Sequence, residues 1–194
     1  MTSLVAVPPE LADAVEQVRL VDHHVHGALV SSPSRTAFGN AINEADTEPL
    51  PDDVDPFDSQ LGFAIRTWCA PVLGLPRHAS AHDYWTARST LDEPAVNHRF
   101  LQAAGVSDWV VDPGIGAGSL LDPESMAVAS GASSHHVVRL EVMLENLARL
   151  GTPPSAVVDD FRVALRSSSA SVVGAKTILA YRCGFAVELS RPSD

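Results

Sequence analysis

Apolar residues recur along this chain at two spacings, one typical of helices and the other typical of strands. Helical spacing is found at residues 8–18, 57–74, 80–105, 144–151 and 154–168, and a further short helix is expected within 119–131. Apolar runs of strand length lie at residues 19–26, 107–112, 134–143 and 171–181. Because strands and helices alternate in the second half of the chain, the pattern predicts a parallel sheet covered by helices.

The number of residues between successive predicted strands indicates which kind of parallel sheet they form. The strands end near His24, Asp112, Glu141 and Lys176. The first interval between strand ends is long. The next two are close to the length of one β/α repeat, which is roughly 30 residues in a (β/α)8 barrel. We therefore expect an α/β fold, a partial (β/α)8 TIM barrel with about four parallel strands, flanking helices and a long insertion after the first strand, at about residues 28–105.

The first part of this insertion has a composition unlike the rest of the chain. Residues 28–58 are rich in Ser, Pro, Asn, Asp and Glu and show little apolar periodicity. Such a segment predicts a long loop or lid rather than a packed element.

Composition favours one domain and excludes several classes of partner. The 194 residues are 45% hydrophobic, which is enough for one core, so we expect a single domain over residues 1–194. The formal net charge of -11 disfavours binding to nucleic acid or to anionic lipid surfaces. No apolar run reaches the roughly 20 residues of a membrane span, and the first residues lack a signal-peptide pattern, so a cytoplasmic protein is expected. Cys69 and Cys183 form no CxxC pair, which argues against a cysteine-rich zinc site.

Candidate metal ligands lie at the end of the first predicted strand. Asp22, His24 and His26 alternate there, so their side chains are expected on one face of the strand. Two imidazoles on one face can converge on a divalent ion, and a nearby carboxylate can orient a ligand ring. A polar turn after a strand is the alternative explanation of this short motif. The carboxyl end of a parallel strand, closed by Gly27, favours the metal site because α/β barrels carry their chemistry there.

Charged residues at the ends of the second and third predicted strands are further candidates. Arg139 and Glu141 are two residues apart in a predicted strand and should share a face. They are either a structural ion pair, or Arg139 holds a substrate carboxylate or a metal ligand while Glu141 acts as acid, base or supporting carboxylate. Asp112 is a candidate for substrate binding, although its Asp-Pro-Gly context is also typical of a turn.

Lys176, the single lysine of the chain, lies in the fourth predicted strand. A buried ammonium needs an anionic partner or a lowered pKa. The lysine could therefore transfer a proton, form a Schiff base or carry a carbamate that bridges metals. It could equally form a structural pair with Glu141 or Asp112. Arg182 follows at the exit of the strand and could bind a carboxylate, or be a solvated loop arginine.

Other motifs are weaker candidates. His78 and His82 are four residues apart, but Pro76 and the possible cap Ser80 suggest that a helix begins between them. The pair His135 and His136 lies at the start of a strand and is expected to be structural. The GIGAG segment at residues 114–118 lacks the Lys-Ser/Thr of a P-loop and is expected to be a barrel loop.

Three segments together, VDHHVHG, VVRLE and VVGAKTILAYRCGF, resemble the amidohydrolase superfamily over about residues 19–188. The resemblance is to its amidohydrolase-related branch, which includes the metal-dependent half of some glutamine-synthetase fusion proteins. It implies a (β/α)8 barrel with one or two divalent metals, with His24 and His26 as ligands. It also maps the lysine and Tyr-Arg segment of the branch onto Lys176, Tyr181 and Arg182, which would make Tyr181 and Arg182 substrate-binding residues.

The chain departs from the pattern of this family after the fourth strand. In the superfamily, strands five and six add histidines and strand eight adds an aspartate, and we expect strands 5–8 to be absent here. The expected function is a metal-dependent hydrolase, with zinc as the expected metal, acting on C–N or C–O bonds of a small carboxylate-bearing substrate. We expect this chain alone to be inactive, and its partner to be a second copy or a missing C-terminal half. The alternatives are a nonhydrolytic decarboxylase or sugar-acid isomerase, and a catalytically silent interaction module.

Overall fold

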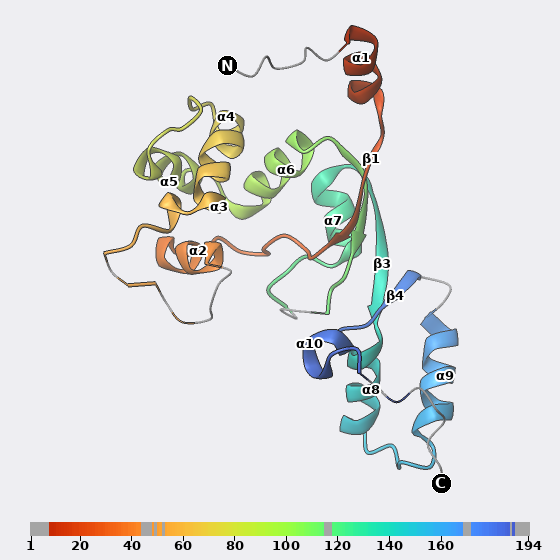
Figure 1. The fold of residues 1–194 in the computed structure, drawn as a ribbon. Coiled ribbons are helices and arrows are strands. Elements are labelled where there is room, and N and C mark those ends of the chain that lie inside the picture. The colour runs from red at the N-terminus through yellow and green to blue at the C-terminus, as the bar shows by residue number, and fades with distance from the viewer. Residues whose placement is uncertain are drawn as a thin grey trace.

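The computed structural model describes residues 8–43, 48, 50–51, 53–114, 118–168, 172–186 and 188. Its centre is a four-stranded sheet in the order β1-β2-β3-β4, in which every neighbouring pair is parallel (Figure 1). The strands are β1 (Leu20–Val25), β2 (Val106–Val111), β3 (Ser133–Arg139) and β4 (Val172–Lys176). This sheet confirms the predicted α/β fold with four parallel strands.

Helices make up most of the other regular structure. Between β1 and β2 lie α2 (Arg35–Ile42), a 3₁₀ turn (Pro56–Asp58), α3 (Gln60–Ala64), a π-helical turn (Ile65–Cys69), α4 (Ala70–Val72), α5 (Ala81–Ser89) and α6 (Glu93–Ala103). The others are α1 (Pro9–Gln17), α7 (Pro123–Ser130), α8 (Leu140–Arg149), α9 (Val157–Ser168) and α10 (Leu179–Cys183). Helices α2 to α6 form an insertion to the left of the sheet in Figure 1. Helices α8 and α9 pack against each other at the lower right. None of the described helices is long and apolar enough to cross a membrane.

The prediction of an unpacked loop over residues 28–58 is wrong in part. Helix α2 forms there, with the Ser34 hydroxyl accepting a hydrogen bond from the backbone of Ala37. Phe38 of this helix stacks on Phe57 at a ring-centroid distance of 5.9 Å, and Phe57 is almost completely buried. Phe38 also lies close to Tyr84 and Trp85 of α5, and these partners from a later helix were hidden by the polar composition of the segment itself. Residues 44–47, 49 and 52 of this segment lie outside the described residues.

Two of the apolar runs predicted as strands extend beyond the strands that form. The third run reaches Met143 and its strand was expected to end near Glu141, but β3 ends at Arg139 and α8 begins at Leu140. The sequence LEVMLENLAR consists largely of good helix formers with apolar residues at helical spacing, and this preference ends the strand. The fourth apolar run continues to Tyr181, but β4 ends at Lys176, the end expected from the spacing of the strands, and a short helix, α10, follows.

Most of the described buried apolar residues form two clusters. One lies within the helical insertion and contains Ile42, Phe57, Ala70, Ala79 and Tyr84. The other lies between the sheet and α7 and contains Trp109, Val111 and Met126. The second cluster packs β2 against α7 and thereby fixes the position of Asp112, which directly follows β2.

Parallel pairing brings the carboxyl ends of the four strands to one edge of the sheet. Arg139 at the end of β3 is paired in register with Lys176 at the end of β4, and Val25 is paired with the last residue of β2. His26 and Asp112 directly follow β1 and β2. Side chains that are far apart in the sequence therefore meet at this edge.

Candidate metal centre

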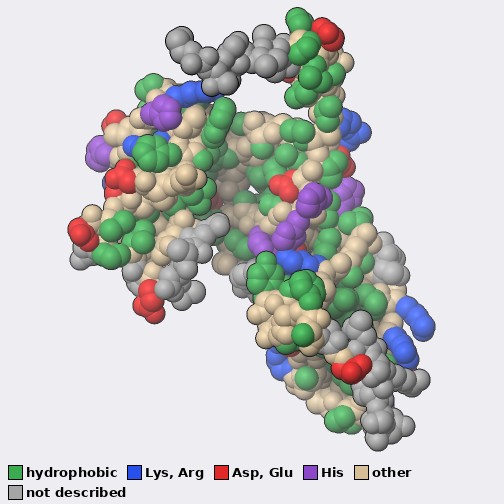
Figure 2. Space-filling model, in the orientation of Figure 1, with side chains coloured by type: hydrophobic (Ala, Val, Ile, Leu, Met, Phe, Trp, Pro, Cys, Tyr) green, Lys and Arg blue, Asp and Glu red, His purple; other side chains and the backbone are tan. Residues whose placement is uncertain are grey.

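His24 and His26 lie at the end of β1 with their rings close together. The ring centroids are 5.4 Å apart and the ring planes are inclined by 74°. Directly after β1 and His26, the backbone of Gly27 lies against the backbone of Leu121. Only glycine fits here, because a Cβ atom at this position would lie 1.8 Å from the carbonyl oxygen of Leu121. The two rings are thus held side by side, as the HxH pattern predicted. Figure 2 shows histidine side chains gathered over the sheet, next to a basic side chain.

Asp112 joins the two histidines from the neighbouring strand. Its side chain is fully buried, and its backbone N–H donates to the carbonyl of Val25 over 2.8 Å. Its own carbonyl is 2.8 Å from Nδ1 of His26 and accepts the hydrogen bond of that ring nitrogen when it carries the proton. The imidazole, carboxylate and imidazole each offer one ligand atom, and these three atoms lie within 4.8 Å of one another. Within the part of the chain that the structure describes, this is the one such group of three or more His, Cys, Asp or Glu residues.

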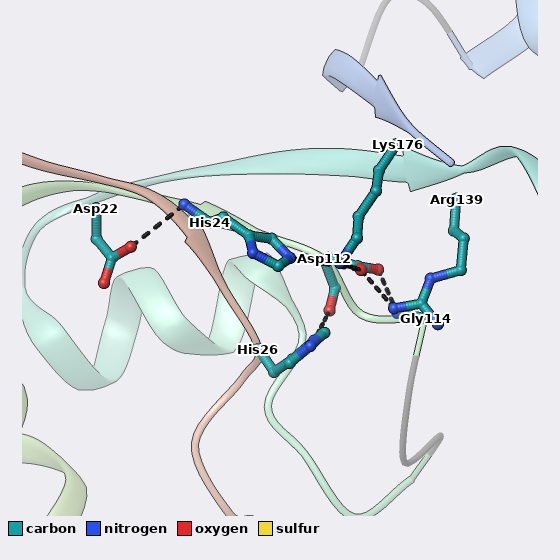
Figure 3. A network of polar contacts seen from close by, with 7 residues as sticks. All are labelled: Asp22, His24, His26, Asp112, Gly114, Arg139 and Lys176. Carbon is teal, nitrogen blue, oxygen red and sulfur yellow. Dashed lines mark hydrogen bonds and ion pairs between the residues drawn. The ribbon is translucent and has the colours of Figure 1, made fainter. Parts of the chain in front are cut away.

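Two cations and a backbone amide surround the carboxylate of Asp112 (Figure 3). Its Oδ2 atom is 2.5 Å from Nη2 of Arg139 and 3.0 Å from Nζ of Lys176, and its Oδ1 atom accepts from the Gly114 N–H over 2.8 Å. Burial by itself would raise the pKa of Asp112. The hydrogen bonds from Arg139, Gly114 and Lys176 outweigh burial and lower the pKa to about 2. Asp112 is therefore a carboxylate anion at neutral pH.

His24 is held in its neutral form. Its Nε2 atom lies 2.5 Å from Nζ of Lys176 and 3.9 Å from Oδ2 of Asp112. Burial lowers the pKa of His24, and the charges of Lys176 and His26 lower it further against the opposing charge of Asp112. A neutral imidazole is the form that binds a metal.

The chemistry of this donor set fits a divalent transition metal. Imidazole nitrogen and carboxylate oxygen are both common zinc ligands, and a catalytic zinc takes three protein ligands and keeps one open position. The contact of His26 Nδ1 with a backbone carbonyl leaves its Nε2 atom as the ligand, in the way outer partners usually fix a ligating histidine. The Asp22 carboxylate, by contrast, accepts from the backbone N–H of His24 and does not reach the His24 ring. Asp112 was expected from the sequence as a substrate-binding residue, a turn or a partner of Lys176, and not as a metal ligand. The pairing with Lys176 is confirmed at 3.0 Å.

The shared strand face predicted for Arg139 and Glu141 is wrong, because Glu141 lies in the first turn of α8. Its Oε1 atom accepts from the Thr177 hydroxyl and from the Ile178 N–H, which is 3.0 Å away. Burial alone would raise the pKa of Glu141, but these hydrogen bonds lower it. The carboxylate thus anchors the turn directly after Lys176. Arg139 pairs with Asp112 instead.

The other candidates lie away from this cluster. Tyr181 and Arg182 are on α10, where Tyr181 is 90% exposed and Arg182 pairs with Glu145 over 2.6 Å. His78 contacts the Thr67 hydroxyl over 3.3 Å. It precedes α5, so the expected helix start between the two histidines, His78 and His82, is confirmed.

His135 contacts Asp108 over 3.2 Å. Both residues lie within their strands rather than at the carboxyl edge, and Arg19 also pairs with Asp108, over 3.1 Å. This is the structural role expected for His135. Residues 115–117 of the GIGAG segment lie outside the described residues.

The parallel sheet, its intervening helices and the polar site at its carboxyl edge define about half of a TIM barrel. The chain is similar in structure to a protein from Lactobacillus casei ATCC 334 that is assigned as a metal-dependent hydrolase, with a TM-score of 0.68 and 24% sequence identity over 92% of this chain. The match covers 46% of that protein's chain, so the present chain spans about half of its length. No protein-family model and no curated protein matches the sequence. The match confirms the predicted fold.

Proposed function

We propose that this chain carries the metal-binding part of a metal-dependent hydrolase that cleaves a C–N or C–O bond in a small carboxylate-bearing substrate. The observation that supports the proposal is the convergence of His24, His26 and Asp112 at the carboxyl edge of a parallel sheet. Zinc is the metal we propose, because two imidazoles and one carboxylate form a known type of catalytic zinc site. When bound there, such an ion supplies a water molecule of lowered pKa and polarises a carbonyl group.

The residues around the ligands have separate roles in this proposal. Lys176 remains 22% exposed, so its ammonium group can meet a substrate carboxylate or hold a proton at Nζ. Glu141 fixes the turn that follows Lys176 and thereby the direction of this side chain. Tyr181 and Arg182 are proposed to contact a more distant part of the substrate, since both are exposed on α10.

The metal assignment is tested by measuring zinc bound to the purified chain. The double variant His24→Ala/His26→Ala should lose bound zinc, whereas His98→Ala should retain it, because His98 contacts the carbonyl of Ala129 away from the site. Equal zinc content in all three proteins would contradict the ligand assignment. Hydrolysis itself is tested with a panel of carboxylate substrates in isotopically labelled water. Release of carbon dioxide or of an isomer without label incorporation would replace hydrolysis by decarboxylation or isomerisation.

We also propose that a second copy of the chain completes the barrel. Among the described residues, β1 and β4 each pair with one neighbouring strand, which leaves the outer edges of both strands unpaired. Val21 on β1 and Val173 on β4 are 56% and 62% exposed. Unpaired apolar edges favour association, and a β4 edge can pair in parallel with the β1 edge of a copy related by two-fold symmetry. Two copies would supply the eight strands of a closed barrel.

Light scattering after size-exclusion chromatography tests this association. The wild-type chain should have the mass of two chains, and Val173→Lys should have the mass of one. Val128→Lys is the matched control, because Val128 is 80% exposed on α7 and lies away from the free edges. A wild-type monomer, or a dimer that forms only with a different polypeptide, would refute the second copy as the partner.

A further inference from the structure

We propose that Arg139 is a positioning residue for the metal centre and that it acts together with the backbone of Gly114 by clamping the carboxylate of Asp112. The inference rests on the proposed function, since it concerns the same ligand cluster. Of the two functional roles that the sequence left open for Arg139, the inference selects the positioning of a metal ligand over contact with a substrate carboxylate.

The burial of Arg139 supports this task. Its side chain is 6% exposed, and Nη2 lies 2.5 Å from Oδ2 of Asp112, whose side chain has no exposed surface. At this burial the guanidinium offers almost no surface to a substrate carboxylate, and its Nη2 atom already donates to Asp112. Lys176, which binds the same oxygen and is 22% exposed, is the cation that remains accessible.

Gly114 covers the ion pair from the loop that follows β2. Its N–H donates to Oδ1 of Asp112 over 2.8 Å. A Cβ atom at position 114 would lie 2.7 Å from Nε of Arg139 and 2.8 Å from Oδ1 of Asp112. The backbone therefore lies directly on the ion pair, at a distance that no other residue type permits without displacement.

The clamp holds both oxygens of the carboxylate. Gly114 holds Oδ1, Arg139 holds Oδ2, and the carboxylate cannot rotate about its own axis without losing one of these bonds. Oδ2 is also the oxygen found 3.9 Å from Nε2 of His24. Partners outside the ligand set are worth 10–100-fold in metal affinity in characterised metal sites, because they fix the direction of a ligand.

A glycine-to-alanine pair provides the test, with Zn²⁺ alone as the probe in a competition titration against a chromogenic chelator. Gly114→Ala inserts a methyl group beside Arg139 and Asp112 without altering any proposed ligand. We expect it to weaken Zn²⁺ binding about 10–100-fold. Gly174→Ala on β4 is the matched control, because the nearest atom to its added Cβ would be Val137 Cγ2 at 3.9 Å. This variant should bind Zn²⁺ as the wild type does.

Arg139→Lys is the second variant, and the same titration is made on it if Gly114→Ala does not fold. It keeps the positive charge but loses the planar fork, so Zn²⁺ affinity should fall while the unfolding transition remains cooperative. Arg139→Met should weaken binding further than Arg139→Lys. Wild-type affinity in folded Gly114→Ala or in folded Arg139→Lys would overturn the clamp. A wild-type chain that binds no Zn²⁺ would overturn the proposed function and this inference with it.

Discussion

Asp112→Asn, compared with Asp108→Asn, separates the contribution of a fully buried charge from that of a partly exposed one. The substitution keeps the shape of the side chain but removes the negative charge that faces Arg139 and Lys176. Asp108→Asn makes the same change four residues earlier on β2. There the main cationic partner is Arg19, whose side chain is 77% exposed, so water replaces the lost charge.

The expected magnitude follows from the burial of the partners. The Arg139 side chain is 6% exposed, and removing one member of a buried ion pair costs about 3–5 kcal/mol, because the other charge stays buried without compensation. We therefore expect Asp112→Asn to lower the free energy of unfolding by about 3–5 kcal/mol. The loss in Asp108→Asn should be a small fraction of this value.

Urea denaturation followed by circular dichroism measures both losses. A chelator is added to all samples, so that bound metal does not contribute to the comparison. Equal destabilisation by the two substitutions would refute the reasoning, because burial is the main difference between them. A larger loss in Asp108→Asn would refute it as well.

Two further predictions concern the helical core and the exit of β1. Burial raises the pKa of Tyr84, so its neutral form stabilises the fold, and stability should fall as pH rises above about 10, where the unfolded phenol ionises. In Tyr181→Phe, which leaves Tyr84 as the single tyrosine, phenolate absorbance should appear together with alkaline unfolding, and ionisation in the folded state would contradict this. Gly27→Ala should cost about 1–3 kcal/mol in urea denaturation, because its Cβ would lie 1.8 Å from the Leu121 oxygen, whereas Gly174→Ala should cost much less. Equal losses in the two glycine variants would contradict the close-approach argument.

Local pattern was sufficient for the order of the strands but not for every helix or for every element end. The helix after Ser80 was predicted from a cap and an apolar spacing that are both local, and α5 begins at Ala81 with Ser80 as its cap. The end of β3 was misplaced, because an apolar run such as VVRLEVM suits a strand and a buried helix start equally well. Helix α2 was missed since Phe38 gains its partners only after the chain has folded.

The sequence by itself determined the parallel α/β arrangement and the placement of His24 and His26 at a strand end, because alternation and apolar spacing are properties of neighbouring residues. Tertiary structure decided which charges meet. It brought Asp112 to His26 across 86 positions of sequence, and to His24 as well, and paired it with Arg139 rather than leaving Arg139 to Glu141. It also removed Tyr181 and Arg182 from the cluster by placing them on a helix. The physical reason is that the partner of a buried charge is set by strand register and by where each strand ends, and both depend on packing between distant segments.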